Sequence, residues 1–311
     1  LIDLLEDRKM SVKYNSEESK LYSLIGGGPQ GSWTGQQAYL VANDDNASHI
    51  SQEDRYKFCD DLSILEIIML ADILIEYDFQ KHVASDVGVN QKFLPVSQIK
   101  TQENLDKISL WTQENLMKLK ESKTDYQVFT RTQNRFATRL TLNGKYIERK
   151  EVSLLLGVWL QEDGGWKTNT QALCKKAFSR MSMLTRLRYA GVGIEDLLVI
   201  YKQFIRTTLE YCSVVFHSSL TAQQAASLER CQAVSLRVIL QESYVSYSAA
   251  CEMAGIKKLF DRRLDRCLDF SIKCSEDPYS SRSFSGNPNL DLSRETRNRE
   301  QFKVSFGRTL Q

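Results

Sequence analysis

The apolar positions of the chain follow two different periods. Up to about residue 165 they come in short runs separated by polar turns, which predicts strands. From residue 166 to about 275 they recur every three or four residues, which predicts helices that bury one face. Beyond Ser275 the chain is rich in Ser, Asn, Pro and Arg, so we expect a poorly ordered tail over 276–311. The predicted fold class is α+β, with regions 1–165, 166–275 and 276–311.

Three polar turns between apolar runs predict β-hairpins in the first region. They are Asn15–Ser19, Asp60-Asp61 within a run from Arg55 to Leu65, and Asn143-Gly144 between Leu142 and Tyr146. The Asn-Gly pair is the strongest of these signals, because both residues tolerate the left-handed backbone of a tight hairpin turn. Residues 126–129 and 154–160 are each expected to form one strand, and 76–100 a loop or insertion.

Helical spacing predicts the remaining elements. The expected helices cover residues 101–119, 172–188, 197–208, 222–240 and 259–274.

Composition places the chain among ordinary globular proteins. The hydrophobic fraction is 42% and the charged fraction 26%, and no apolar run approaches the roughly 18 residues of a membrane span. The seven cysteines include no C-x-x-C pair, so they predict free thiols in a reducing compartment rather than a zinc site. We therefore expect a protein of the cytoplasm or nucleus that is neither secreted nor membrane-bound.

Positive charge is concentrated in one segment, although the net charge is only +2. Between Gly164 and Ile194 there are six basic residues and no acidic one. Such a stretch suits a polyanion such as a nucleic-acid backbone. The alternative is a solvated helix face, which charge alone favours.

The adjacent carboxylates of Asp60 and Asp61 repel each other unless a cation or water separates them. A divalent metal removes the conflict, because Mg²⁺ prefers carboxylate oxygens and keeps substrate phosphates as further ligands. The alternative is that both aspartates simply favour a turn, and for an isolated pair that alternative is preferred.

Four segments together resemble the conserved motifs of reverse transcriptases, in the order of that family. Phe58-Cys59-Asp60-Asp61 resembles the aromatic-x-Asp-Asp motif C, and Gly27–Ser32 resembles motif B with its Pro-Gln-Gly-Ser loop. Residues 115–119 with Ser122-Lys123 resemble motif D, and 155–160 resembles motif E, the primer grip. The segments Lys175–Ala177 and Ile205–Tyr211 are similar to the thumb of non-LTR retroelement polymerases of the jockey and LINE type.

The resemblance implies a partial polymerase palm over 1–165 and an all-helical thumb and connection over 166–275. It implies that Asp60 and Asp61 bind Mg²⁺, with Mn²⁺ as a substitute, in a two-metal nucleotidyl transfer to a primer 3′-hydroxyl. Lys123 would donate a proton to pyrophosphate, although its alternative is a solvent-exposed lysine after a helix. The partners implied are an RNA template, a DNA primer and deoxynucleoside triphosphates.

The remaining roles that the resemblance implies fall into three groups. Pro29, Gln30, Gly31, Ser32 and Phe58 would bind the nucleotide; Leu156, Gly157 and Val158 would form the primer grip; Lys175, Lys176 and Arg180 would contact the nucleic-acid backbone. Trp159 and Trp166 are expected to pack in the core rather than to stack on a base.

Motif A, which carries another metal-binding aspartate in this family, has no counterpart before residue 20. We therefore expect the chain to be a fragment that is catalytically inert alone. The alternative is a degenerate, non-enzymatic remnant that at most binds nucleic acid through its basic helices.

Overall fold

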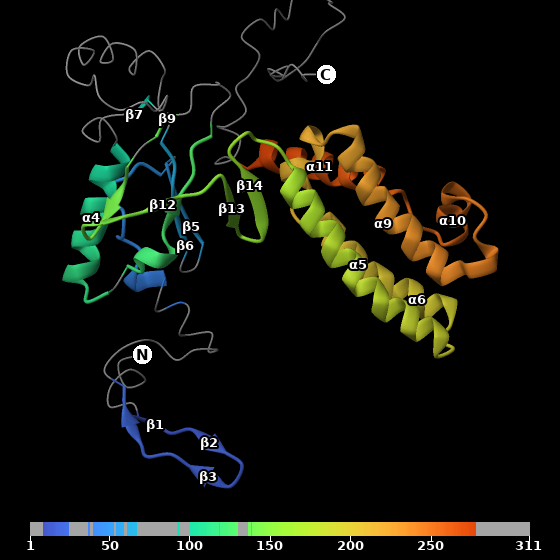
Figure 1. The fold of residues 1–311 in the computed structure, drawn as a ribbon, viewed down its shortest axis with the longest axis horizontal. Helices are drawn as coiled ribbons and strands as arrows, with labels where there is room; N and C mark the ends of the chain where they lie inside the picture. Colours follow the sequence, from blue (N-terminus) through green and yellow to red (C-terminus); the bar gives the residue numbers. More distant parts are fainter. Residues whose placement is uncertain are drawn as a thin grey trace, which may run out of the picture. The chain divides into compact units, whose positions relative to one another are not determined.

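The computed structural model describes residues 9–24, 37, 40–52, 54–58, 61–66, 92–93, 100–117, 119–129, 136–137 and 139–277. They divide between two compact units (Figure 1). Unit 1 comprises Leu1–Tyr126 with Arg131–Lys150, and unit 2 comprises Gln127–Thr130 with Glu151–Gln311. The division at Lys150 differs from the expected boundary near residue 165, because the intervening hairpin packs on the helices of unit 2. The structure has the mixed helix and strand of the α+β class.

The strands of unit 1 are short and pair two by two in the described part of the chain. The pairs are β1 (Lys9–Met10) with β4 (Tyr22–Ser23), β2 (Lys13–Tyr14) with β3 (Glu17–Glu18), β5 (Arg55–Phe58) with β6 (Asp61–Ile64), β7 (Lys92–Phe93) with β9 (Phe136–Ala137), β8 (Asp125–Tyr126) with β12 (Glu148–Arg149), and β10 (Thr141–Leu142) with β11 (Lys145–Tyr146).

All three predicted hairpins are present. The turns lie at Asn15-Ser16, between Phe58 and Asp61, and at Asn143-Gly144. Asn143 and Gly144 have φ of 52° and 75°, the left-handed pair that a two-residue hairpin turn requires. One strand prediction in this region was wrong in extent, because the strand expected over 126–129 is limited to β8. Of the stretch 76–100, predicted as a loop or insertion, the structure describes only β7 and the start of α4.

One helix of unit 1, α4 (Lys100–Glu114), ends five residues before the predicted 119. The helix stops because Leu116 adopts a left-handed φ of 55°, and the amide of Met117 turns back to donate to the carbonyl of Thr112 at 2.7 Å. Ile108 of α4 is buried against Ala47 and Ile50, with Leu62 and Ile64 of β6 packed on the same cluster. The β5–β6 hairpin is thereby attached to α4.

In the described part of unit 2, the regular elements are helices apart from one hairpin. That hairpin consists of β13 (Val152–Leu155) and β14 (Val158–Gln161), where the sequence predicted a single strand over 154–160. The chain reverses because Leu156 and Gly157 both have positive φ, 46° and 82°, and form a tight turn that carries no Asn-Gly signal.

The helices of unit 2 follow the predicted periodicity closely. They are α5 (Lys167–Tyr189), α6 (Ile194–Ile200), α7 (Arg206–Glu210), α8 (Ser213–Phe216), α9 (Ala222–Leu240), α10 (Tyr247–Met253) and α11 (Leu259–Glu276). The helix predicted over 197–208 is interrupted by a π-helical turn, Tyr201–Ile205, that links α6 to α7. The short helices α8 and α10 were not predicted, because neither is long enough to show a period. The tail expected to be poorly ordered lies outside the described residues from 278 onward.

The core of unit 2 is formed mainly by α5 and α9, which lie side by side (Figure 1). Ala177 and Leu184 of α5 and Leu228 and Leu236 of α9 are fully buried. This matches the spacing of apolar residues on which the helices were predicted. None of the helices that the structure describes is long and apolar enough to cross a membrane.

Buried polar groups connect helices that are far apart in sequence. The Tyr201 hydroxyl donates to Gln232 Oε1 at 2.6 Å, and Gln232 Nε2 donates to the Tyr247 hydroxyl at 2.9 Å. Burial raises the pKa of the Tyr201 hydroxyl far above its ordinary value, so this group remains a neutral donor. Glu210, which is 2% exposed, forms ion pairs with Arg262 and Arg266 of α11.

Candidate nucleic-acid interface

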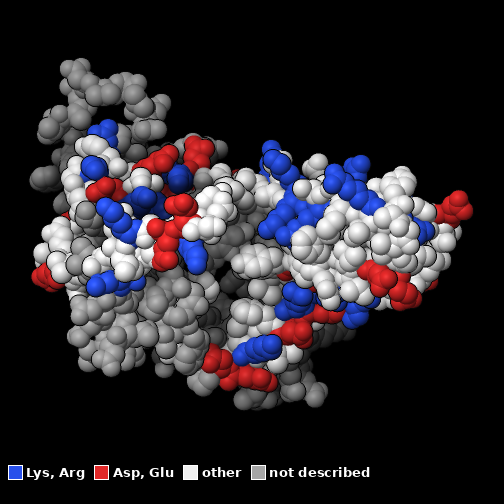
Figure 2. Space-filling model, turned by 90° about the horizontal axis from the view of Figure 1, so that it is seen from below, with Lys and Arg blue, Asp and Glu red and all other residues white. Residues whose placement is uncertain are grey.

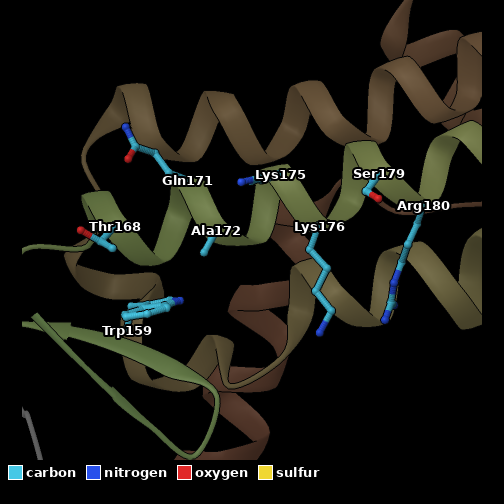
Figure 3. A pocket seen from close by; sticks show the side chains of 8 residues that line it. All are labelled: Trp159, Thr168, Gln171, Ala172, Lys175, Lys176, Ser179 and Arg180. Atoms are coloured by element: carbon cyan, nitrogen blue, oxygen red, sulfur yellow. The ribbon is translucent and has the colours of Figure 1, made fainter.

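A groove of about 630 Å³ lies along the N-terminal half of α5, next to β14, and is the main candidate site of unit 2 (Figure 3). It is lined by Trp159 of β14 and by seven residues of α5: Thr168, Gln171, Ala172, Lys175, Lys176, Ser179 and Arg180. All three residues that were predicted to contact a nucleic-acid backbone are therefore brought together. No acidic side chain is among the lining residues.

The buried face of α5 determines which side chains line the groove. Leu173, Ala177, Met181 and Leu184 are buried at the three- and four-residue spacing of one helix face. The same periodicity turns Lys175 and Lys176 outward, and both are exposed. The concentration of basic residues in the sequence thus becomes a basic surface.

Two side chains fix the hairpin to the start of α5. The backbone amide of Trp159 donates to Oδ1 of Asn169 at 3.2 Å, and Asn169 is only 1% exposed. Gln161 Oε1 accepts from the amide of Thr168 at 2.7 Å, which satisfies one of the free amides in the first turn of α5. β14 and the groove face of α5 therefore form one preorganised surface.

The two lysines of the groove make no ion pair or hydrogen bond with the residues that the structure describes. Each ammonium remains available to an anionic ligand, which is the property that phosphate recognition needs. In Figure 2, basic side chains gather on one part of the surface of unit 2, while acidic side chains lie mainly elsewhere on it.

Arg180 differs from the lysines because its guanidinium is already held by the protein. Its Nη1 donates to the Phe204 carbonyl and to Thr208 Oγ1, the latter at 2.5 Å, and its Cζ lies 4.5 Å from the centre of the Phe204 ring. These contacts fix the side chain in place and leave its other nitrogens for a ligand. Arg180 is thus a rigid donor, whereas Lys175 and Lys176 are mobile charges on flexible stems.

The predicted primer-grip residues form the turn of the β13–β14 hairpin, at Leu156 and Gly157, and the first position of β14, at Val158. Leu156 and Gly157 are exposed, and Val158 is buried. The carbonyl of Leu156 accepts a hydrogen bond of 2.7 Å from the hydroxyl of Tyr211, which follows α7. A side chain at position 157 would lie 3.3 Å from Cε1 of Tyr211, so only glycine leaves this close approach unstrained.

The carboxylate motif lies in unit 1, on the β5–β6 hairpin. Phe58 ends β5 and pairs across the turn with Asp61, which begins β6; both side chains are exposed. Cys59 and Asp60 lie between them, outside the described residues. At the described positions, no cluster of three or more His, Cys, Asp or Glu residues is poised to hold a metal ion.

Strand β5 of this hairpin is anchored by its own Lys57, whose ammonium donates to the carbonyls of Asn43 at 2.7 Å and Asp44 at 3.0 Å. Partial burial, together with the charge of Arg55, lowers the pKa of the Lys57 amine. This lysine therefore supports the hairpin and is not free to bind a substrate.

The other predicted site residues of unit 1 are only partly described. Lys123 ends a 3-10 turn, Glu121–Lys123, and its side chain is exposed, as both the catalytic and the solvent-exposed interpretations require. Pro29, Gln30, Gly31 and Ser32 lie outside the described residues.

No protein-family model, curated protein or solved structure matches this chain.

Several residues that build this site were missed by sequence reasoning. Tyr211 and Asn169 act through hydrogen bonds to backbone groups 55 and 10 residues away, and neither has a local signal. Trp159 was expected in the core, but it is half-buried at the edge of the groove. Trp166 does pack inward, with its ring centre 6.0 Å from that of Phe216.

Proposed function

We propose that the chain is part of an RNA-directed DNA polymerase of a non-LTR retroelement. The observation that carries the proposal is Phe58-Cys59-Asp60-Asp61 on a tight β-hairpin, with the exposed carboxylate of Asp61 directly after the turn. Asp61 is therefore presented to solvent instead of being buried, as a metal ligand requires. The resemblance of three further segments to motifs B, D and E, in family order, supports the same function.

In this proposal the two units take two different roles. The hairpins and α4 of unit 1 would form part of a palm, and the helices of unit 2 would form a thumb. Leu156, Gly157 and Val158 would hold the primer near its 3′ end. Lys175, Lys176 and Arg180 would hold the nucleic-acid backbone by charge, without reading bases.

The chemistry would depend on the residues of the carboxylate turn. Asp60 and Asp61 would hold Mg²⁺ (or Mn²⁺), which when bound activates a 3′-hydroxyl and stabilises the leaving pyrophosphate. The exposed position of Asp61 is suitable for metal binding, because no described side chain competes for its carboxylate oxygens. Residues 29–32 and Phe58 would shape the nucleotide site, and Lys123 would protonate pyrophosphate.

The decisive test is primer extension by the full coding sequence that contains this chain. We expect it to extend an oligo(dT) primer on a poly(rA) template with Mg²⁺, and Asp60→Ala to abolish extension because a metal ligand is lost. Asp44→Ala, which removes a nearby exposed carboxylate outside the motif, is the matched control and should retain activity. Full activity of Asp60→Ala would rule out the metal-ligand assignment.

A second function, nucleic-acid binding without catalysis, is favoured by the groove on α5. The groove has basic residues and no lining acid, and it needs no metal to bind phosphate. An upstream strand that carries the motif A aspartate would favour the polymerase. Binding of a primer–template by the full protein, with no extension and no such strand, would favour the second function.

A further inference from the structure

Besides its lysines and its arginine, the groove of unit 2 is lined by an uncharged hydrogen-bond donor, the indole of Trp159. Trp159 lies at the hairpin side of the groove, beneath Ala172, and the nitrogen of its indole is on the edge turned towards Lys176 (Figure 3). Among the described residues, that N–H has no acceptor. An indole N–H is a donor only, and this one is not among the buried unpaired atoms, so it is open to an acceptor from outside the protein.

The backbone that carries this indole is held in place before any ligand arrives. The backbone amide of Trp159 donates to buried Asn169. Two residues further along β14, the side chain of Gln161 accepts from the amide of Thr168 in the first turn of α5. Trp159 also pairs with Leu154 across the hairpin. Because the strand is already held, less conformational entropy is lost when the indole binds a ligand.

The other polar groups of the groove select the kind of acceptor. Thr168, Gln171 and Ser179 offer hydroxyl or amide hydrogens, and Lys175 and Lys176 offer unpaired ammonium groups. With no carboxylate on the groove wall, the complementary ligand is an anion that presents several oxygen acceptors. A phosphodiester fits, because one non-bridging oxygen can accept from a neutral donor while the charge is balanced by a lysine.

We propose that Trp159 is a positioning residue whose indole N–H donates a hydrogen bond to a backbone phosphate of bound nucleic acid, beside Lys176. The inference rests on the proposed function, since it identifies the ligand of the same groove. The hydrogen bond fixes where along α5 a phosphate sits, while the lysines supply attraction that does not depend on register.

The test measures binding of the 311-residue chain to a fluorescently labelled RNA–DNA duplex by anisotropy over a range of salt concentrations. Trp159→Phe keeps an aromatic ring and removes the donor. Loss of one hydrogen bond to a charged oxygen predicts a Kd roughly tenfold higher or more. The slope of log Kd against log salt should not change, because no charge is lost.

Two lysine variants separate the hydrogen bond from charge. Lys176→Gln should raise Kd and make the salt slope shallower by about one. Lys273→Gln, on the exposed surface of α11, removes the same charge outside the groove and should change both Kd and the salt slope much less.

A benzothienyl-alanine at position 159 keeps the shape of the indole without its N–H. Thermal unfolding checks that each variant is folded.

Each remaining outcome is decisive. An unchanged Kd for the benzothienyl variant, with weaker binding by Lys176→Gln, would overturn the role of Trp159 and leave the groove as a nucleic-acid site. An unchanged Kd for both would overturn the groove assignment, and no binding by the unmodified chain would contradict the proposed function itself. Equal competition by polyglutamate and by unlabelled nucleic acid of the same charge would overturn the phosphodiester as ligand.

Discussion

Gly157 shows how a single residue determines the shape of the candidate primer grip. Its φ of 82° lies in the left-handed region, and its Cα faces the ring of Tyr211. The hydroxyl of the same tyrosine holds the carbonyl of Leu156. One aromatic side chain thus contacts both residues of the turn.

We expect Gly157→Ala to destabilise unit 2 by more than the roughly 1–2 kcal/mol that a left-handed backbone costs an alanine. The excess arises because the added methyl would lie 3.3 Å from Tyr211 Cε1. Urea unfolding of Gly157→Ala and Gly164→Ala measures it, since Gly164 also has a positive φ, 69°, but nothing within 4 Å of an added methyl. Equal losses in the two variants would show that the contact with Tyr211 contributes nothing.

At the scale of elements, the start of α4 is capped by a residue that follows the β5–β6 hairpin. Glu66 comes two residues after β6, and its carboxylate accepts from the amides of Lys100 at 3.1 Å and Thr101 at 2.8 Å, and from the Thr101 hydroxyl. An acid at this position satisfies free amides and interacts favourably with the helix dipole. A side chain 34 residues away thus caps the helix.

Glu66→Ala is expected to destabilise unit 1 by about 1–2 kcal/mol, because two amides of the first turn lose their acceptor. Glu103→Ala is the control on the same helix. It breaks the exposed ion pair with Lys107, at 2.6 Å, which solvent screens, so it should cost much less than the loss of the cap. Thermal unfolding compares the two, and a smaller effect of Glu66→Ala would refute the cap.

For the whole of unit 2, the charged cluster around Glu210 joins α7 to α11, more than 50 residues further along the chain. The carboxylate lies at the end of α7 and forms ion pairs with Arg206 one turn earlier and with Arg262 and Arg266 of α11. Glu210 is almost completely buried, whereas the arginines reach solvent to different degrees. α11 is therefore attached by charge as well as by its buried Leu259.

Glu210→Gln should destabilise unit 2 by roughly 2–3 kcal/mol, since three guanidinium groups lose a buried counter-charge. The value is below that of a fully buried pair because the arginines are partly solvated. Asp265→Asn removes an acid of α11 whose pair with Lys257, at 2.9 Å, is exposed, and it should have little effect. Denaturant unfolding with equal losses for the two variants would contradict a structural role of Glu210.

Local patterns were sufficient for most elements of this chain. The helices over 222–240 and 259–276 and the turn at Asn143-Gly144 were predicted closely, because periodicity and turn chemistry depend only on neighbouring residues. The basic face of α5 followed from the same periodicity. The strands that flank the carboxylate pair form a hairpin, as their apolar runs predicted.

Contacts between distant residues required the folded chain. The hairpin of β13 and β14 belongs with the helices because Asn169, Gln161 and Tyr211 hold it there. Such hydrogen bonds join residues with no common period, so no window along the chain predicts them. The position of Trp159 in the groove has the same origin. Residue order thus specified the helices, the turns and the charge of α5, while tertiary packing determined which backbone groups and donors meet at the site.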